Sequence, residues 1–182
     1  MNNISFILPE LFISLSLMFL LIAGVFKKNS SNLIYNLTTI SLLVTLALTL
    51  NYPIETDIKL FNSSYKIDYL SSFMKILTLL SGIFIMFTST KYIQITKIFK
   101  IEYPVLILSA ILGMMVMISS NDLIVFYLGL ELQSLALYVL ASFNRDNLMS
   151  SESGVKYFVL SALSSGLLLY GCSLIYGFSN ST

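Results

Sequence analysis

The stretch Asp122-Leu-Ile-Val-Phe-Tyr-Leu-Gly-Leu-Glu131-Leu-Gln-Ser-Leu-Ala-Leu-Tyr-Val-Leu-Ala-Ser-Phe143 is a run of apolar residues with one carboxylate near its midpoint. A helix needs roughly 20 apolar residues to cross the ~30 Å hydrocarbon core of a membrane, and this stretch has that length. Glu131 then lies near the bilayer centre, where an ionised carboxylate costs about 2.5 to 3.5 kcal/mol on insertion scales. We therefore expect Glu131 to face protein or water and to bind a proton or a cation.

The other polar residues of this stretch share the face of Glu131. At helical spacings of three and four residues, this face carries Tyr127, Glu131, Ser134, Tyr138 and Ser142. A single packing hydrogen bond does not require so many polar positions in register, so the stripe favours a functional carboxylate. The alternative is a structural acid bonded to a neighbouring helix, since tyrosine and serine are also common where membrane helices pack.

Composition indicates an integral membrane protein. Of the 182 residues, 57% are hydrophobic and 10% are charged, whereas soluble domains carry about 25% charged residues. The net charge of +1 and the absence of a basic tract give no reason to expect nucleic acid. Histidine is absent and the only cysteine is Cys172, so haem, iron–sulfur clusters and structural zinc lack their usual ligands. We expect no metal or cofactor on this chain.

The apolar runs predict a single all-α membrane domain over residues 1–182. The expected spans are approximately 6–26, 33–52, 69–90, 103–119, 122–143 and 156–178. The polar segment 54–68 alternates apolar and polar residues, which predicts a short hairpin at the membrane surface. The tight turn 119–122 predicts that the fourth and fifth helices are antiparallel, with Ser120 or Asn121 as the cap of the fifth.

Four charged residues near the ends of the spans have competing interpretations. Glu10 is interpreted as an interfacial residue favoured by a helix N-terminus. Lys75 lies about two turns inside the third span, where it either extends its ammonium to the interface or forms a buried ion pair. Glu152 and Lys156 are four residues apart and share a helical face. They form either a solvent-edge salt bridge or a site in which Lys156 is drawn inward.

Lysine and arginine indicate the orientation. With the N-terminus outside, the outer loops hold Lys59 and Lys66, and the inner loops hold Lys27, Lys28, Lys91, Lys97, Lys100 and Arg145. This excess of positive charge on one side predicts that both termini lie outside.

Two segments closely resemble the subunit 2 family of respiratory complex I, the NADH:quinone oxidoreductase. They are residues 119–143 and Glu152-Ser-Gly-Val-Lys-Tyr-Phe-Val-Leu-Ser-Ala-Leu-Ser-Ser-Gly-Leu-Leu-Leu-Tyr-Gly171, with weaker likeness at Pro9-Glu-Leu-Phe12 and Phe73-Met-Lys-Ile-Leu77. The resemblance implies an antiporter-like subunit that moves protons in response to quinone reduction elsewhere. Glu131 matches the family's glutamate on the fifth helix, and Lys156 matches its lysine at the start of the sixth.

The resemblance also implies where the remaining parts of the machinery lie. NADH, FMN, iron–sulfur clusters and ubiquinone are expected on other subunits. The family's lysines on its seventh, eighth and twelfth helices have no counterpart here, so we expect an N-terminal portion of a split subunit. Small residues at Ala162 and Gly166 leave a surface that a neighbouring helix would cover. We expect a second chain there, beginning with a helix interrupted in mid-membrane and placing a lysine near Glu131.

Expected partners are therefore this second chain, other complex I membrane subunits and lipids. The abundance of Ile, Asn, Phe and Tyr suggests an AT-rich genome and the mitochondrial inner membrane, with a bacterial plasma membrane as the alternative. Two other functions stay open. The chain is either a structural subunit of the same complex that conducts nothing, or part of a cation/proton antiporter.

Overall fold

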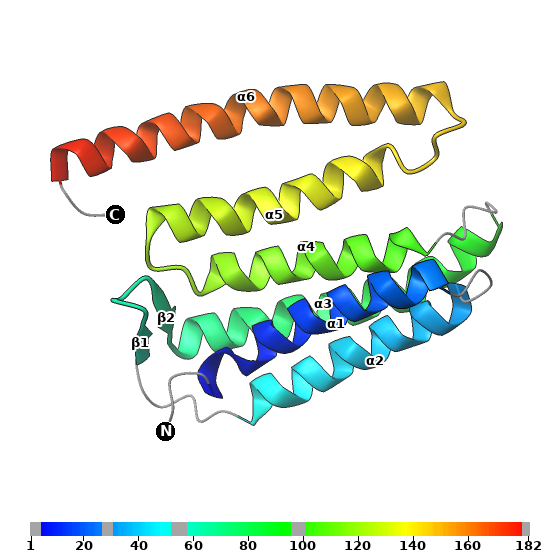
Figure 1. Cartoon of the computed structure of the whole chain (residues 1–182), viewed down its shortest axis with the longest axis horizontal. Helices are drawn as coiled ribbons and strands as arrows, with labels where there is room; N and C mark the ends of the chain where they lie inside the picture. Colours follow the sequence, from blue (N-terminus) through cyan, green and yellow to red (C-terminus); the bar gives the residue numbers. More distant parts are fainter. Residues whose placement is uncertain (1–4, 27–30, 52–57, 96–100, 180–182) are drawn as a thin grey trace.

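The described residues form a bundle of six helices with one short hairpin at its end (Figure 1). The computed structural model describes residues 5–26, 31–51, 58–95 and 101–179. The helices are α1 (Leu8–Phe26), which follows the 3-10 turn η1 (Ser5–Ile7), α2 (Ser31–Leu50), α3 (Tyr69–Ile95), α4 (Glu102–Ile118), α5 (Leu123–Ala141) and α6 (Leu148–Ser179). The expectation of an all-α protein with six helices is confirmed.

Five of these helices are long and apolar enough to cross a membrane, and α4, with 17 residues, is the shorter one. At 1.5 Å per residue α4 is about 26 Å long, near the lower limit for a span. The first turn of α1 and the last turn of α6 lie at the same end of the bundle (Figure 1). The core lies between α1, α2, α3 and α4, where Ile13, Leu42, Leu79 and Leu108 are almost completely buried.

Two helix boundaries differ from the expected spans. Helix α3 continues to Ile95, so Lys91 lies within the helix and not in the predicted loop. Helix α6 begins at Leu148, eight residues before the expected start at 156. The reason is local, because the side chain of Asn147 accepts a hydrogen bond from Met149 N at 3.0 Å and caps the first turn. The predicted loop lysines Lys27, Lys28, Lys97 and Lys100 lie outside the described residues.

The predicted hairpin is confirmed. Strands β1 (Ile58–Leu60) and β2 (Tyr65–Ile67) pair antiparallel, with Leu60 opposite Tyr65. The hairpin also joins the turn between α4 and α5, because Lys66 N donates to Ser119 O at 2.8 Å and Asn121 N donates to Ser64 O at 2.9 Å. Asp68 then starts α3 with a reciprocal cap, in which its Oδ1 accepts from Ser71 N at 2.7 Å while its own N–H donates to Ser71 Oγ.

The expected cap of the fifth helix is wrong. Asp122, not Ser120 or Asn121, is the cap of α5, and its Oδ1 accepts from Ile124 N at 2.7 Å. The other two side chains have different partners. Asn121 Nδ2 donates to Ser63 O in the hairpin, and Ser120 Oγ donates to Met117 O in the last turn of α4.

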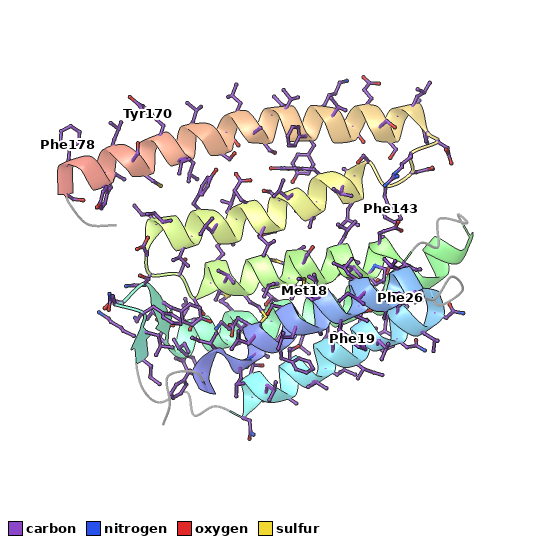
Figure 2. All side chains as sticks on the ribbon, in the orientation of Figure 1. Met18, Phe19, Phe26, Phe143, Tyr170 and Phe178 are labelled. Carbon is purple, nitrogen blue, oxygen red and sulfur yellow. The ribbon has the colours of Figure 1, made fainter. Side chains whose placement is uncertain are left out.

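Two glycines let α4 and α5 approach closely. A Cβ atom on Gly113 would lie 2.6 Å from Gln133 N and 2.8 Å from Gly129 O, so no side chain fits there. Helix α6 packs against α5, but most of its surface is open, and the only buried residue of α6 is Gly154. Figure 2 shows Tyr170 and Phe178 on the outer side of α6. An apolar helix this exposed requires lipid or further protein around it.

Candidate functional site

The structure contains two separate groups of polar residues among the helices. One lies beside the hairpin and is built around Glu10 of α1 and Lys75 of α3. The other follows α5 and is built around Glu131. Both place ionisable side chains in otherwise apolar surroundings, which is the usual setting for function in membrane proteins.

Glu10 and Lys75 form a buried ion pair. Lys75 Nζ lies 2.6 Å from Glu10 Oε1, and each residue is 5% exposed. Tyr65 of β2 completes the group, because its hydroxyl donates to Glu10 Oε1 at 2.7 Å and accepts from Lys75 Nζ at 2.9 Å. This cluster, which we call the hairpin-end cluster, connects α1, α3 and the hairpin.

Glu10 lies in the first turn of α1, as expected, and its side chain is also buried and paired within the protein. Of the two interpretations of Lys75, the buried ion pair is the one observed. The sequence carried a signal for this pairing. Glu10 is in the first turn of α1, and Lys75 is near the start of α3. Only one helix, α2, separates α1 from α3 in the sequence, so in an up-and-down bundle α1 and α3 run in the same direction. Their early residues therefore lie at similar depth.

Glu131 is half-buried on α5, and one of its carboxylate oxygens is unsatisfied. Oε1 is buried and has no hydrogen-bond partner. Among the described residues, no lysine or arginine forms an ion pair with Glu131. A carboxylate in this state has unmet demand for a proton, a cation or a hydrogen-bond donor.

The polar stripe predicted on α5 is directed in part toward α6. Tyr138 is 7% exposed and packs edge to face with Tyr157 at 4.8 Å and Phe158 at 5.7 Å between ring centroids. The Tyr127 hydroxyl lies near both the Glu131 carboxylate and Ser165 of α6. Ser134 Oγ donates to the backbone oxygen of Glu131 at 3.1 Å. Tyr127 therefore lies between the Glu131 carboxylate and α6, and Tyr138 packs against α6 through aromatic rings.

Lys156 is not brought to Glu131. Its Nζ pairs with Glu152 Oε1 at 2.6 Å within α6, and the two side chains are 69% and 63% exposed. The geometry is that of an exposed pair four residues apart, which is worth only a few tenths of a kcal/mol. The described chain thus leaves Lys156 available to a partner on the open side of α6. In the described residues no group of three His, Cys, Asp or Glu side chains is placed to hold a metal ion.

Sequence comparison identifies relatives of this chain. The family model described as "NADH:quinone oxidoreductase/Mrp antiporter, TM" matches residues 120–182. NADH-quinone oxidoreductase subunit N of Pelagibacter ubique is 72% identical over the whole chain, and that of Maricaulis maris is 48% identical. The chain spans 39% and 38% of the length of these two relatives.

Comparison with solved structures gives the same fold. A chain of respiratory complex I from Thermus thermophilus, determined with bound aureothin, matches with a TM-score of 0.81 and 25% identity. The match covers 95% of this chain and 37% of that one. A chain of the membrane-bound sulfane sulfur reductase, an archaeal respiratory membrane complex, has a TM-score of 0.84 at 18% identity, which shows the fold alone.

Proposed function

This chain is homologous to the N-terminal part of NADH-quinone oxidoreductase subunit N, the bacterial equivalent of subunit 2, and on this premise we propose that it contributes the first part of a proton-translocating unit. Glu131 is the proton carrier in this proposal. The observation that carries it is the buried, unpartnered Oε1 of Glu131 in the middle of an apolar helix. Such a group takes up a proton when it is alone and releases it when a cation approaches.

The proposed mechanism is a switch between these two states. A lysine that moves toward Glu131 favours the carboxylate, and a lysine that moves away favours the protonated acid. A conformational change elsewhere in the complex would thereby cause proton uptake or release. Tyr127, Ser134 and Tyr138 have a supporting role along the proton route. Lys156, with Glu152 as its resting partner, passes protons to or from the open side of α6.

Further helices complete the unit in this proposal. Added Cβ atoms at Gly166, Gly171 and Gly177 would meet nothing, so this surface of α6 has room for closely packed neighbours. We place the remaining helices of the subunit there, beginning with one interrupted in mid-membrane that brings a lysine near Glu131. A separately encoded chain carrying them stays a prediction. Other membrane subunits of complex I and lipids cover the rest.

The proposed enzyme is an H+-translocating NADH:ubiquinone reductase, with NADH, FMN, iron–sulfur clusters and ubiquinone on other subunits. The relatives named above are bacterial, which supports the bacterial plasma membrane over the mitochondrial inner membrane. Their names also support an oxidoreductase subunit over a separate cation/proton antiporter. Copurification with NADH dehydrogenase activity in mild detergent would support the same choice.

The test is Glu131→Gln in the assembled complex. We expect normal assembly and a several-fold loss of NADH-driven proton pumping, because the amide keeps the shape but cannot carry the proton. Glu131→Asp should lose less. Glu102→Gln, the same chemical change at the start of α4 and outside the stripe, is the matched control. Normal pumping by assembled Glu131→Gln would favour the structural, non-conducting subunit.

A further inference from the structure

The hairpin-end cluster contains more hydrogen-bonding groups than its residues satisfy. Lys75 Nζ has three N–H groups, and two of them have partners, Glu10 Oε1 and the Tyr65 hydroxyl. Glu10 Oε2 is buried and has no partner. A buried ion pair is stable only if its remaining donors and acceptors are also satisfied. The cluster therefore requires another polar molecule.

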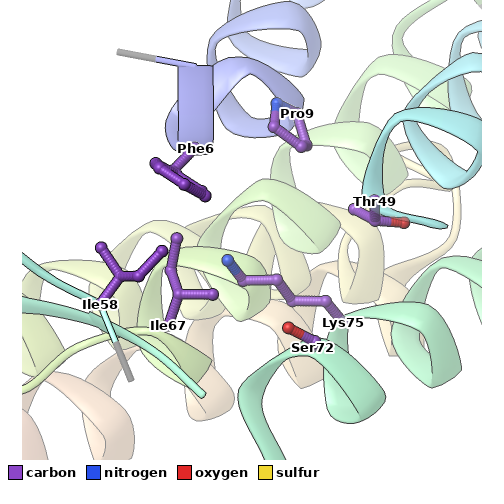
Figure 3. Close-up of a pocket in the computed structure, with 7 residues that line it drawn as sticks. All are labelled: Phe6, Pro9, Thr49, Ile58, Ile67, Ser72 and Lys75. Carbon is purple, nitrogen blue, oxygen red and sulfur yellow. The ribbon is translucent and has the colours of Figure 1, made fainter. Parts of the chain in front are cut away.

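A cavity lies next to this cluster (Figure 3). Its volume is about 30 Å³, and its apolar wall consists of Phe6, Pro9, Ile58 and Ile67. Its polar wall consists of Lys75, Ser72 and Thr49. Figure 3 shows the Lys75 side chain running through this region, with Nζ directed toward Phe6 and Ile67.

The size and the polarity of this cavity fit water. A water needs at least about 10 to 15 Å³ of such volume and two or more polar partners. Lys75 supplies the donor. Ser72 supplies an acceptor, since its hydroxyl forms no hydrogen bond with the described residues. A larger ligand does not fit, and a cation is disfavoured beside the ammonium of Lys75.

We propose that this cavity binds a water molecule, which accepts a hydrogen bond from Lys75 Nζ and donates one to Ser72 Oγ. The water then gives the third N–H of Lys75 a partner. Glu10 does not line this cavity, and this water leaves its Oε2 without a partner. This site is separate from Glu131 and does not depend on proton pumping.

The direct test is a structure of the membrane assembly that contains this chain, at a resolution that reveals buried waters. We expect density within hydrogen-bond distance of both Lys75 Nζ and Ser72 Oγ. An empty cavity in a map that shows other buried waters would overturn the proposal.

A cavity-filling variant gives an independent test. Ser72→Val removes the acceptor and fills part of the space, so the water density should disappear and the midpoint of thermal unfolding should fall. Ser81→Val makes the same change at an exposed position of the same helix, and it controls for the cost of valine in α3. Equal midpoints for the two variants, or density that persists in Ser72→Val, would contradict the proposed site.

Discussion

The ion pair of Glu10 and Lys75 connects residues that are remote in the sequence. Its 2.6 Å contact and 5% exposure make it a buried pair, not a surface salt bridge. Removing a single member of such a pair typically costs about 3 to 5 kcal/mol, because the remaining charge is left uncompensated. Glu10 and Lys75 therefore constrain each other, and neither tolerates substitution alone.

Tyr65 makes the stability that this cluster provides depend on pH in the alkaline range. Burial of the phenol, with the negative charge of Glu10 beside it, raises the pKa of Tyr65 far above its ordinary value of 10.0. Above pH 10.0 the folded protein thus keeps a proton that the unfolded chain has lost. The stabilisation from Tyr65 is complete below that pH and decreases as the pH rises.

We therefore expect the free energy of unfolding to fall more steeply above pH 10 in the native protein than in Tyr65→Phe. The phenylalanine variant should be less stable at neutral pH, by about 1 to 3 kcal/mol, because it leaves Lys75 and Glu10 short of a partner. Thermal or denaturant unfolding at a series of pH values measures both effects. Parallel pH profiles for the two proteins would mean that Tyr65 does not contribute in this way.

At the scale of the helices, the short distance between the antiparallel helices α4 and α5 depends on contact between their backbones. Gly113 faces the backbone of Gln133 and Gly129, and an added methyl group would meet backbone atoms that cannot move independently. The helices would have to separate, and overpacking of this kind costs about 1 to 3 kcal/mol.

Gly113→Ala should therefore lower the thermal unfolding midpoint and shift Glu131 relative to α4. Gly166→Ala is the matched control when the chain is produced without further subunits, since an added Cβ at Gly166 meets nothing within this chain. The steady-state level in membranes and the melting temperature of the two variants measure the cost of the added methyl group. A normal melting temperature for Gly113→Ala would mean that the helices separate at little cost.

The helices could be predicted from the sequence because each depends on its own apolar residues. The hairpin was predictable from alternation, and the tight turn 119–122 from its shortness. The caps were not. Ser120, Asn121 and Asp122 are all good capping residues, and the choice of Asp122 depends on the hairpin, which takes the side chain of Asn121. Local propensity does not distinguish these three residues as caps, and the tertiary contact with the hairpin selects Asp122.

The candidate site was predictable to a smaller extent. The stripe of Tyr127, Glu131 and Tyr138 follows from helical period, and its direction toward α6 required the three-dimensional structure. The pairing of Glu10 with Lys75 was missed because an acid in the first turn of a helix has a sufficient local explanation. Only the parallel arrangement of α1 and α3 brings its partner to the same depth.

At the scale of the whole molecule, the described loops lie at the ends of the bundle that the charge asymmetry of the sequence predicts. The hairpin, with Lys59 and Lys66, lies at the end of the bundle where α1 begins (Figure 1). The connection between α5 and α6, with Arg145, lies at the other end. The orientation with the hairpin outside stays a prediction, since four of the inner lysines lie outside the described residues.

The open side of α6 and the unsatisfied carboxylate of Glu131 lead to one prediction about the assembly. The described part of α6 buries only Gly154, and Glu131 Oε1 has no partner. If further helices of the subunit complete the unit, we expect them to cover α6 and to supply a positive charge at the depth of Glu131, because a membrane carboxylate with an unsatisfied oxygen is costly.

In a structure of the intact assembly, we therefore expect a lysine from those helices within about 4 to 6 Å of the Glu131 carboxylate, the range over which an opposite charge favours the ionised form. Replacing that lysine with methionine should reduce proton pumping about as much as Glu131→Gln. The double variant should lose little more than either single variant, because the two groups act as a pair. Additive losses would mean that the two residues act independently. If Glu131 faced lipid, or a chain with no basic residue in reach, the carboxylate would lack the switch that proton translocation needs. A structural subunit would then be the better account.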